Sequence, residues 1–195
     1  MTMLTDNWER LGPQLPAPLT LGPLLKPARD LIAPHLPGGE WKKWDAPYFE
    51  PLARDLVNGW LARMERDPWQ LDHQTQIPTT LAILESGRAV GMAAWGWEHF
   101  PSGWRRVELS IYDPRDWNRG LGTAVLRAWS DWLLALPDTH RLDLRTWSGN
   151  ERMLRVADKC GFQEDGRLRG AYAWDGRHVD EVICSRIGDA QTAVS

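Results

Sequence analysis

A strand that ends at Asp113-Pro114 is followed by a short loop that holds Gly120 and Gly122, and a helix begins at once. The first turn of a helix leaves backbone N–H groups without partners and carries partial positive charge. Glycines let a phosphate approach that backbone closely, so the segment could hold a pyrophosphate. A P-loop is excluded because no Gly-Lys-Ser/Thr follows, and a dinucleotide fingerprint is incomplete because position 125 is Val. A plain tight turn fits the loop equally well.

Glu108 is the side chain best placed for acid–base chemistry. It lies on the strand that leads to this loop and alternates away from that strand's apolar residues. A carboxylate there could take a proton from a reacting group. It could equally pair with Arg105, Arg106 or a neighbouring strand. Lesser candidates are Glu98, Asp45 and His99, of which His99 is more typical of a strand-end cap.

Three segments, taken together, carry a resemblance. Residues 111–126 resemble the acetyl-CoA loop of the GNAT N-acetyltransferase superfamily, which has Arg or Gln followed at fixed spacing by Gly-x-Gly/Ala. Trp at the first position, as in Trp117, is typical of its RimJ/RimL-like branch. Residues 150–169 resemble that branch's Asn-capped helix with Lys-x-Gly-Phe, and residues 174–180 resemble its closing hairpin. The resemblance covers about residues 79–187.

The resemblance implies an α/β fold, a GNAT-like mixed sheet flanked by helices, whose strands splay apart at a cofactor site. Acetyl-CoA would be the co-substrate, with its pyrophosphate on loop N–H groups and its pantetheine arm along the strand end. A primary amine would attack directly, with a backbone N–H facing the thioester oxygen. The implied cofactor-binding residues are Ile111, Tyr112, Trp117, Asn118, Arg119, Gly120, Leu121, Gly122, Thr123 and Asn150. Asn150 could equally be a simple helix N-cap.

One position departs from the superfamily pattern. Many members carry Tyr seven residues after the Asn, where it protonates the CoA thiolate, and here that position is Ala157. The acid is then Tyr112, Ser148, water or no group at all; the catalytic candidates are Glu108 and Tyr112. Two alternatives to an N-acetyltransferase therefore stay open. One is a non-catalytic acyl-CoA-binding module of the same fold, and the other is a transferase that uses a longer acyl-CoA.

The chain holds 13 Trp beside 3 Tyr and 3 Phe. Large aromatic side chains fill cores and line binding sites alike. In the implied fold the acceptor pocket is built by the front helices, their loop and the last hairpin, where aromatic walls with a few carboxylates would suit a cationic amine. The predicted acceptor-site residues are Trp41, Trp44, Tyr48, Trp95 and Trp97.

Alternation and turn signals predict the elements that position these residues. Strands are expected over 79–84, 89–97, 104–112, 141–146, 166–173 and 178–187, and helices over 122–136 and 150–159. A strand–helix–strand unit over 104–146 requires a parallel pair, whereas the flanking hairpins are antiparallel, so the sheet is mixed. We expect one domain over 1–195, with an α-rich acceptor-side segment (1–78) and a cofactor-binding core (79–187). Within that front segment a short strand is expected at 19–21, and helices at 28–33 and from Phe49 to Met64.

Composition excludes several classes of protein. With 23 Lys+Arg, 26 Asp+Glu and a net charge of −3, the chain lacks the basic excess of a nucleic-acid binder. It has no membrane-length apolar stretch and no signal-peptide pattern. Cys160 and Cys184 are interpreted as core residues, and the five His lack metal-ligand spacing, so no metal is expected. We expect a cytoplasmic monomer or homodimer whose partner is a small-molecule amine or a peptide N-terminus.

Overall fold

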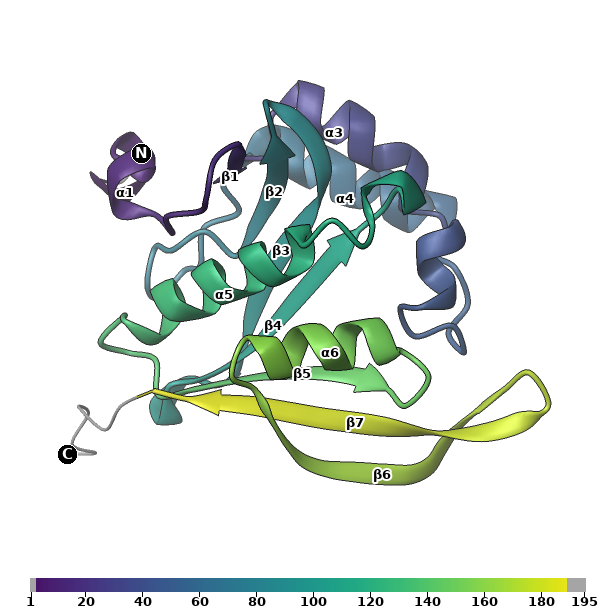
Figure 1. Ribbon diagram of the computed structural model, residues 1–195. Helices are drawn as coiled ribbons and strands as arrows, with labels where there is room; N and C mark the ends of the chain where they lie inside the picture. The colour runs from purple at the N-terminus through teal and green to yellow at the C-terminus, as the bar shows by residue number, and fades with distance from the viewer. Residues whose placement is uncertain (1–2, 189–195) are drawn as a thin grey trace.

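A computed structural model describes residues 3–188. Figure 1 shows one twisted sheet with helices on both faces. Its seven strands have the order β1-β2-β3-β4-β5-β7-β6, and every neighbouring pair is antiparallel except β4–β5. The predicted mixed sheet is therefore confirmed. The strands are β1 Leu19–Gly22, β2 Thr80–Glu85, β3 Arg88–His99, β4 Trp104–Ile111, β5 Arg141–Trp147, β6 Gln163–Trp174 and β7 Arg177–Ile187.

The helices form two layers. α5 and α6 lie on the near face of the sheet in Figure 1, and α3 and α4 cover β2 and β3 from behind. The helices are α1 Met3–Asp6, α2 Trp8–Leu11, α3 Lys26–Ile32, α4 Arg54–Arg66, α5 Leu121–Leu134 and α6 Glu151–Lys159. Short 3-10 turns are η1 Ala33–His35, η2 Glu40–Lys43, η3 Phe100–Ser102 and η4 Pro114–Asp116.

Each helical layer has its own core. The larger core fills the α5 and α6 face and includes the fully buried Trp129 and Leu142. The smaller core fills the α3 and α4 face, around Ile32, Met64 and Tyr112. Alternation along β4 explains both cores, because its successive side chains point to opposite faces of the sheet.

The sheet opens between its two parallel strands. Only three residue pairs join β4 to β5, from Trp104↔Arg141 to Arg106↔Asp143. Beyond Arg106 the two strands diverge, whereas β5 stays paired with β7 along its whole length. Figure 1 shows the divergence as a wedge that opens between β4 and β5. The splayed strands expected from the sequence are present, and the outer half of β4 has no strand partner on this side.

The front segment differs from its prediction. The expected helix from Phe49 begins only at Arg54, and Phe49 and Leu56 are exposed, at 56% and 64%. Met64 of the predicted face is buried as expected, and Val57, which was not part of that face, is buried with it. Pro51 explains the late start, because the residue before a proline is biased away from helical geometry. The apolar spacing that suggested the helix therefore marks a surface beside the sheet.

Candidate functional site

The loop between β4 and α5 presents backbone N–H groups at a helix start. Gly120 caps α5 with a left-handed φ of 82°, a conformation that favours glycine. The first bond of the helix runs from the Ala124 N–H to the Gly120 carbonyl, at 3.0 Å. The N–H groups of Leu121, Gly122 and Thr123 precede that bond and point out of the helix end. This is the geometry of an anion site, as the sequence predicts.

A network of four charged side chains, which we call the charged clasp, fixes this loop to the β2–β3 turn. Its members are Glu85, Arg88, Asp116 and Arg119. Asp116 accepts from Arg88 at 2.7 Å and from Arg119 at 3.0 Å. Glu85 accepts from Arg119 at 2.7 Å and from Arg88 at 3.2 Å. The hydrogen bond from Arg88 is the largest cause that lowers the pKa of buried Asp116. Arg119, expected on the cofactor side, is thus used within the protein through its side chain.

The outer half of β4 carries free backbone groups toward the wedge. The Tyr112 N–H donates to the Val90 carbonyl on β3, at 3.2 Å. Because backbone direction alternates along a strand, the amide groups of Leu109 and Ile111 face away from β3, into the opening. The indole N–H of Trp117 donates to the Ile111 carbonyl at 2.8 Å, on that same side. Of the two strand-end residues predicted to pair with a cofactor arm, Ile111 turns its backbone to the wedge and Tyr112 does not.

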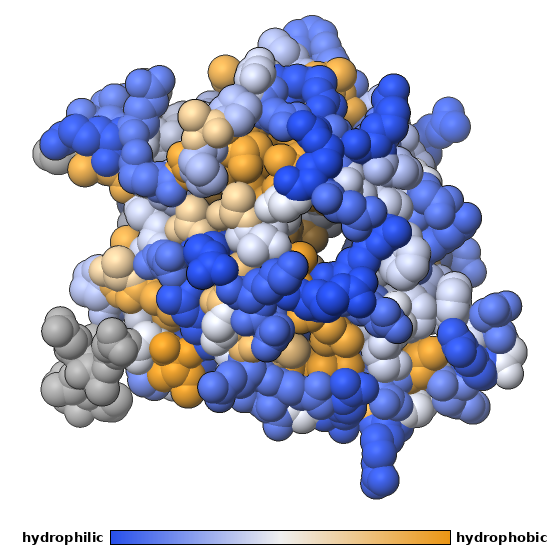
Figure 2. Space-filling view, viewed as in Figure 1, coloured by the Kyte–Doolittle hydropathy of each residue, from blue (hydrophilic) through white to orange (hydrophobic). Residues whose placement is uncertain are grey.

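Arg152, at the start of α6, joins the two sides of the wedge. Its guanidinium carbon lies 4.5 Å from the Trp44 ring centroid and 4.7 Å from that of Trp117. Trp44 belongs to the loop after η2, and Trp117 to the loop before α5. Cation–π contacts of this kind stabilise the two loops against α6. Figure 2 shows a hollow beside this region, right of centre and rimmed by hydrophilic side chains.

Asn150 caps α6 and holds the loop after η2. Its Oδ1 accepts from the Met153 N–H at 3.1 Å, and its Nδ2 donates to the Trp44 carbonyl at 2.7 Å. The Trp147 indole donates to that same carbonyl at 2.9 Å. The helix-cap interpretation of Asn150 is therefore correct, and both ends of its amide have protein partners.

A cavity of about 470 Å³ opens on the opposite face of the sheet, between β4 and the α3–α4 layer. Glu108 and Ser110 of β4 line it because they share the face of Met92 and Ala94, their register partners on β3. Trp60 of α4 and the η2 loop close the other side. The cavity thus lies directly behind the free edge of β4. The same strand therefore borders both the wedge and the cavity.

Two carboxylates in this cavity titrate abnormally. Protein surrounding the Glu108 carboxylate raises its pKa, the Asp45 charge adds to the rise, and Arg106 opposes it. Desolvation likewise raises the pKa of Asp45, and Lys42 lowers it. Both residues are nevertheless exposed to solvent, because the cavity is open. A carboxylate with a raised pKa is a better proton acceptor at neutral pH, which suits a general base.

Only one of the five predicted acceptor aromatics lines this cavity, namely Trp41. Trp95 and Trp97 lie on the other face of β3, where their rings meet edge to face and contact the guanidinium of the buried Arg105, at 4.2 and 4.1 Å. Tyr48 stacks on Tyr172 of β6, with centroids 3.8 Å apart. Sequence reasoning missed Trp60 and the leucines Leu52 and Leu56 as lining residues. The regular spacing of these three was visible, and it was attributed to a helix core.

The remaining chemical candidates are placed in the structure as follows. Tyr112 is buried among His35 and Trp41, and burial raises the pKa of its hydroxyl. Cys160 is buried with a raised thiol pKa, as expected of a core residue. Glu98 is held by Arg106 and Arg145. His99 bonds the Ser102 hydroxyl at 2.7 Å, which agrees with a strand-end role.

Residues 3–188 hold no cluster of His, Cys, Asp or Glu that could bind a metal ion. Within the same residues no helix is both long and apolar enough to cross a membrane.

Fold and site together define an α/β protein in which a helix start with the geometry of an anion site lies beside an open strand edge, with an acidic cavity behind that edge. A comparison with protein families matches residues 19–163 to the acetyltransferase (GNAT) domain. The chain therefore belongs to the GNAT acetyltransferase family, and the fold expected from the resemblance is confirmed.

Solved structures agree in fold. The GNAT-family acetyltransferase from Bacillus anthracis superposes with a TM-score of 0.68 at 11% identity, covering 91% of this chain and 97% of that one. Spermidine N-acetyltransferase from Vibrio cholerae, in complex with CoA and spermine, gives 0.69 at 15% identity, covering 88% and 96%. The microcin C7 self-immunity acetyltransferase MccE, in complex with acetyl-CoA and AMP, gives 0.65 at 17% identity, covering 88% and 93%. A comparison with curated protein sequences finds no match.

Proposed function

We propose that the chain is an N-acetyltransferase that moves the acetyl group of acetyl-CoA to a primary amine by direct attack. One observation carries the proposal: β4 presents free backbone groups to the wedge on one side and the Glu108 carboxylate to the cavity behind it. A donor in the wedge and an acceptor in the cavity would meet at this strand. Proximity of this kind supplies a large part of the rate in a direct transfer.

The donor site consists of groups that this chain leaves free. The N–H groups from Asn118 to Thr123 would bind the pyrophosphate of acetyl-CoA, since they surround the positive end of α5. The backbone of Leu109 and the Ile111 N–H would pair with the amides of its pantetheine arm, as a neighbouring strand would; the Ile111 carbonyl already accepts from Trp117. The complexes of two fold relatives with CoA or acetyl-CoA support this assignment.

Glu108 would act as the base, directly or through water. An alkyl ammonium must lose a proton before it attacks, and the raised pKa of Glu108 brings the two groups closer in basicity. Acetyl-CoA supplies an activated acetyl group: the amine nitrogen forms the C–N bond, the C–S bond breaks, and the nitrogen loses two protons. Glu108 passes one proton to solvent, and the other neutralises the CoA thiolate.

Trp117 at the head of the loop and the Lys-x-Gly-Phe motif support membership of the RimJ/RimL-like branch. One observation favours a second function, a non-catalytic acyl-CoA-binding module. Ala157 stands where many relatives carry a Tyr acid, and it is buried. The tightly held proton of Tyr112 offers no replacement. Both an enzyme and a binding module would bind acyl-CoA, and only the enzyme would release CoA when an amine is added.

The test combines binding with turnover. Thermal unfolding is measured with acetyl-CoA, CoA, longer acyl-CoAs and ATP, because a ligand bound only by the native state raises the melting temperature. We expect a shift with acetyl-CoA and CoA but not ATP, and CoA release once an amine is added. A larger rise in melting temperature with a longer acyl-CoA than with acetyl-CoA would indicate that the longer acyl-CoA is the donor. Binding with no CoA release from any amine would establish the binding module, and no shift at all would refute the wedge as a cofactor site.

A further inference from the structure

The cavity behind β4 carries two carboxylates, and apart from Ser110 and Tyr112 the rest of its lining is apolar. Asp45 and Glu108 are the acidic members of its described lining, and they are close enough for the charge of Asp45 to raise the pKa of Glu108. Asp45 has a cation partner, whereas Glu108 forms no ion pair among the described residues. Lys42 lies 3.8 Å from Asp45, and Arg106 is engaged by Glu98 at 2.5 Å. The pair therefore attracts one small cation.

The rest of the wall offers almost no polar partner. Trp60, Leu52, Leu56 and Met92 contribute hydrocarbon or ring surface. Trp41 contributes its ring alone, because its indole N–H already donates to the His35 carbonyl at 2.8 Å. The exposed Leu56 continues this surface to the cavity mouth. An occupant with an apolar body would remove this surface from water at a gain of about 25 cal/mol per Å².

The same wall disfavours polar acceptors. A polyamine would place its further ammonium groups against hydrocarbon, and an unpaired charge there is costly. An aminoglycoside would leave hydroxyl groups without partners, and a peptide would leave backbone N–H and C=O groups unpaired. The cavity volume of about 470 Å³ is that of a small-molecule site.

We propose that the acceptor is an apolar primary monoamine: a single ammonium held between Asp45 and Glu108, on an alkyl or arylalkyl body that lies against Trp41, Trp60 and Leu56. This inference rests on the proposed N-acetyltransferase function and narrows it. It also explains product release. Acetylation turns the cation into a neutral amide, which loses its attraction to both carboxylates while the apolar contacts remain.

The first test compares two amines of equal length. CoA release from acetyl-CoA is measured with hexylamine and with 1,6-diaminohexane, and also with phenethylamine, spermidine, tobramycin and a short peptide with a free N-terminus. We expect kcat/KM for hexylamine to exceed that for 1,6-diaminohexane by about tenfold or more, because the second ammonium meets an apolar wall. A higher kcat/KM for spermidine, tobramycin or the peptide would overturn the acceptor class and leave N-acetyl transfer standing. No release with any amine would overturn the proposed function itself.

Two variants locate the selectivity in this cavity. Leu56→Glu puts a carboxylate at the apolar mouth, and the exposure of Leu56 lets the protein fold. We expect the hexylamine preference over 1,6-diaminohexane to shrink by about tenfold. Leu25→Glu is the matched control, since Leu25 is 54% exposed and lies outside the cavity lining. An unchanged preference in Leu56→Glu would show that the amine body binds elsewhere.

A binding measurement gives a readout besides activity. Hexylamine is titrated calorimetrically into the protein with and without saturating CoA. We expect Asp45→Asn to weaken binding by about fivefold or more, because it removes one of the two charges that hold the ammonium. Equal affinity in Asp45→Asn and the parent protein would contradict the assigned place of the ammonium.

Discussion

At the scale of the residue, the proposed chemistry depends on Glu108. Its pKa is raised, first by the protein around it and then by Asp45. It accepts a proton only above that pKa, so kcat/KM should fall as pH drops through this raised pKa. Glu108→Gln should lower kcat/KM at neutral pH by about 10²-fold, the usual contribution of a general base. The pH–rate profile from pH 5 to 9 checks both statements.

Tyr112→Phe is the control for this prediction, because it alters the neighbouring side chain on the same face of β4. Burial holds the proton on the Tyr112 hydroxyl, so it is a poor donor to a thiolate. We expect kcat/KM to stay within about threefold of the parent value. A loss as large as that of Glu108→Gln would restore Tyr112 as the acid, and an unchanged acidic limb in Glu108→Gln would remove Glu108 as the base.

Site residues were predictable where the signal is local. The Gly120 loop, the Asn150 cap and Glu108 all depend on a few neighbours along the chain, and the structure has each at its predicted place in the fold. The prediction that Trp95 lies in the acceptor site was wrong, because the register of β3 against β4 decides which face of the sheet its side chain is on. Trp95 pairs with Val107, not with Glu108, and the irregularity at Trp97/His99 helps to set that pairing. A slip of one residue exchanges the two faces of a strand, and no local pattern fixes it.

At the scale of the element, the charged clasp decides how the loop before α5 is presented. Asp116 is buried beneath Arg88 and Arg119, and it ties the loop to the β2–β3 turn. Asp116→Asn should weaken acetyl-CoA binding several-fold, because the loop N–H groups lose their fixed direction. It should lower the free energy of unfolding by about 1 kcal/mol, a modest amount because both arginines are half-exposed. Calorimetric titration and urea unfolding measure the two effects.

The pH dependence of this clasp has a definite sign. Arg88 lowers the pKa of Asp116 in the folded protein, so its stabilisation is complete above the unfolded pKa of about 3.9. It is lost as pH falls through the lower folded pKa.

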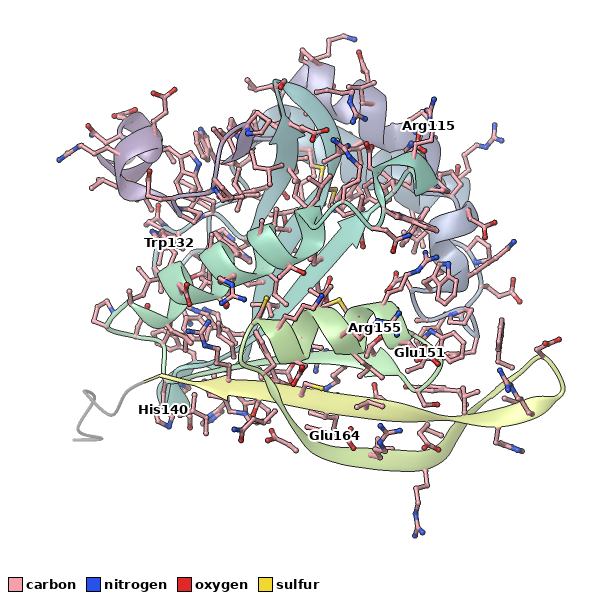
Figure 3. All side chains as sticks on the ribbon, in the orientation of Figure 1. Arg115, Trp132, His140, Glu151, Arg155 and Glu164 are labelled. Carbon is pink, nitrogen blue, oxygen red and sulfur yellow. The ribbon has the colours of Figure 1, made fainter. Side chains whose placement is uncertain are left out.

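The matched control for Asp116→Asn is Glu151→Gln, which breaks an exposed ion pair with Arg155 on α6 (Figure 3). Equal losses of acetyl-CoA affinity in the two variants would mean that the clasp does not orient the loop.

The elements themselves were well predicted from residue 79 onward, because alternation and turn chemistry suffice for hairpins and for a strand–helix–strand unit. The front segment was less predictable. Phe49, Leu52 and Leu56 have the spacing of a buried helix face, yet they border a cavity or solvent. Apolar spacing indicates that a surface is apolar, and only the tertiary structure determines what covers it.

At the scale of the whole molecule, the sheet consists of two parts, β1–β4 and β5–β7–β6, joined at the seam by three residue pairs. Contacts between α5 and α6 reinforce the seam, among them the Cys160 thiol on the Thr123 carbonyl at 3.4 Å. A donor bound in the wedge would pair with the β1–β4 part of the sheet, through Leu109 and Ile111 of β4. It would also rest on the start of α5. Acetyl-CoA should therefore act as a structural link as well as a substrate.

Hydrogen exchange tests this link residue by residue. Without ligand, the Leu109 and Ile111 amides lack a strand partner and should exchange much faster than the Ser110 amide, which faces β3. Saturating CoA should slow the first two amides by about tenfold or more and bring their exchange rates closer to that of Ser110, since each gains a hydrogen bond that it lacks without the ligand. The native state should gain about 2.7 kcal/mol when CoA is at 100 times its Kd. If calorimetry shows CoA bound and neither amide slows, the arm of the cofactor lies outside the wedge, and the direct-transfer geometry at β4 is wrong.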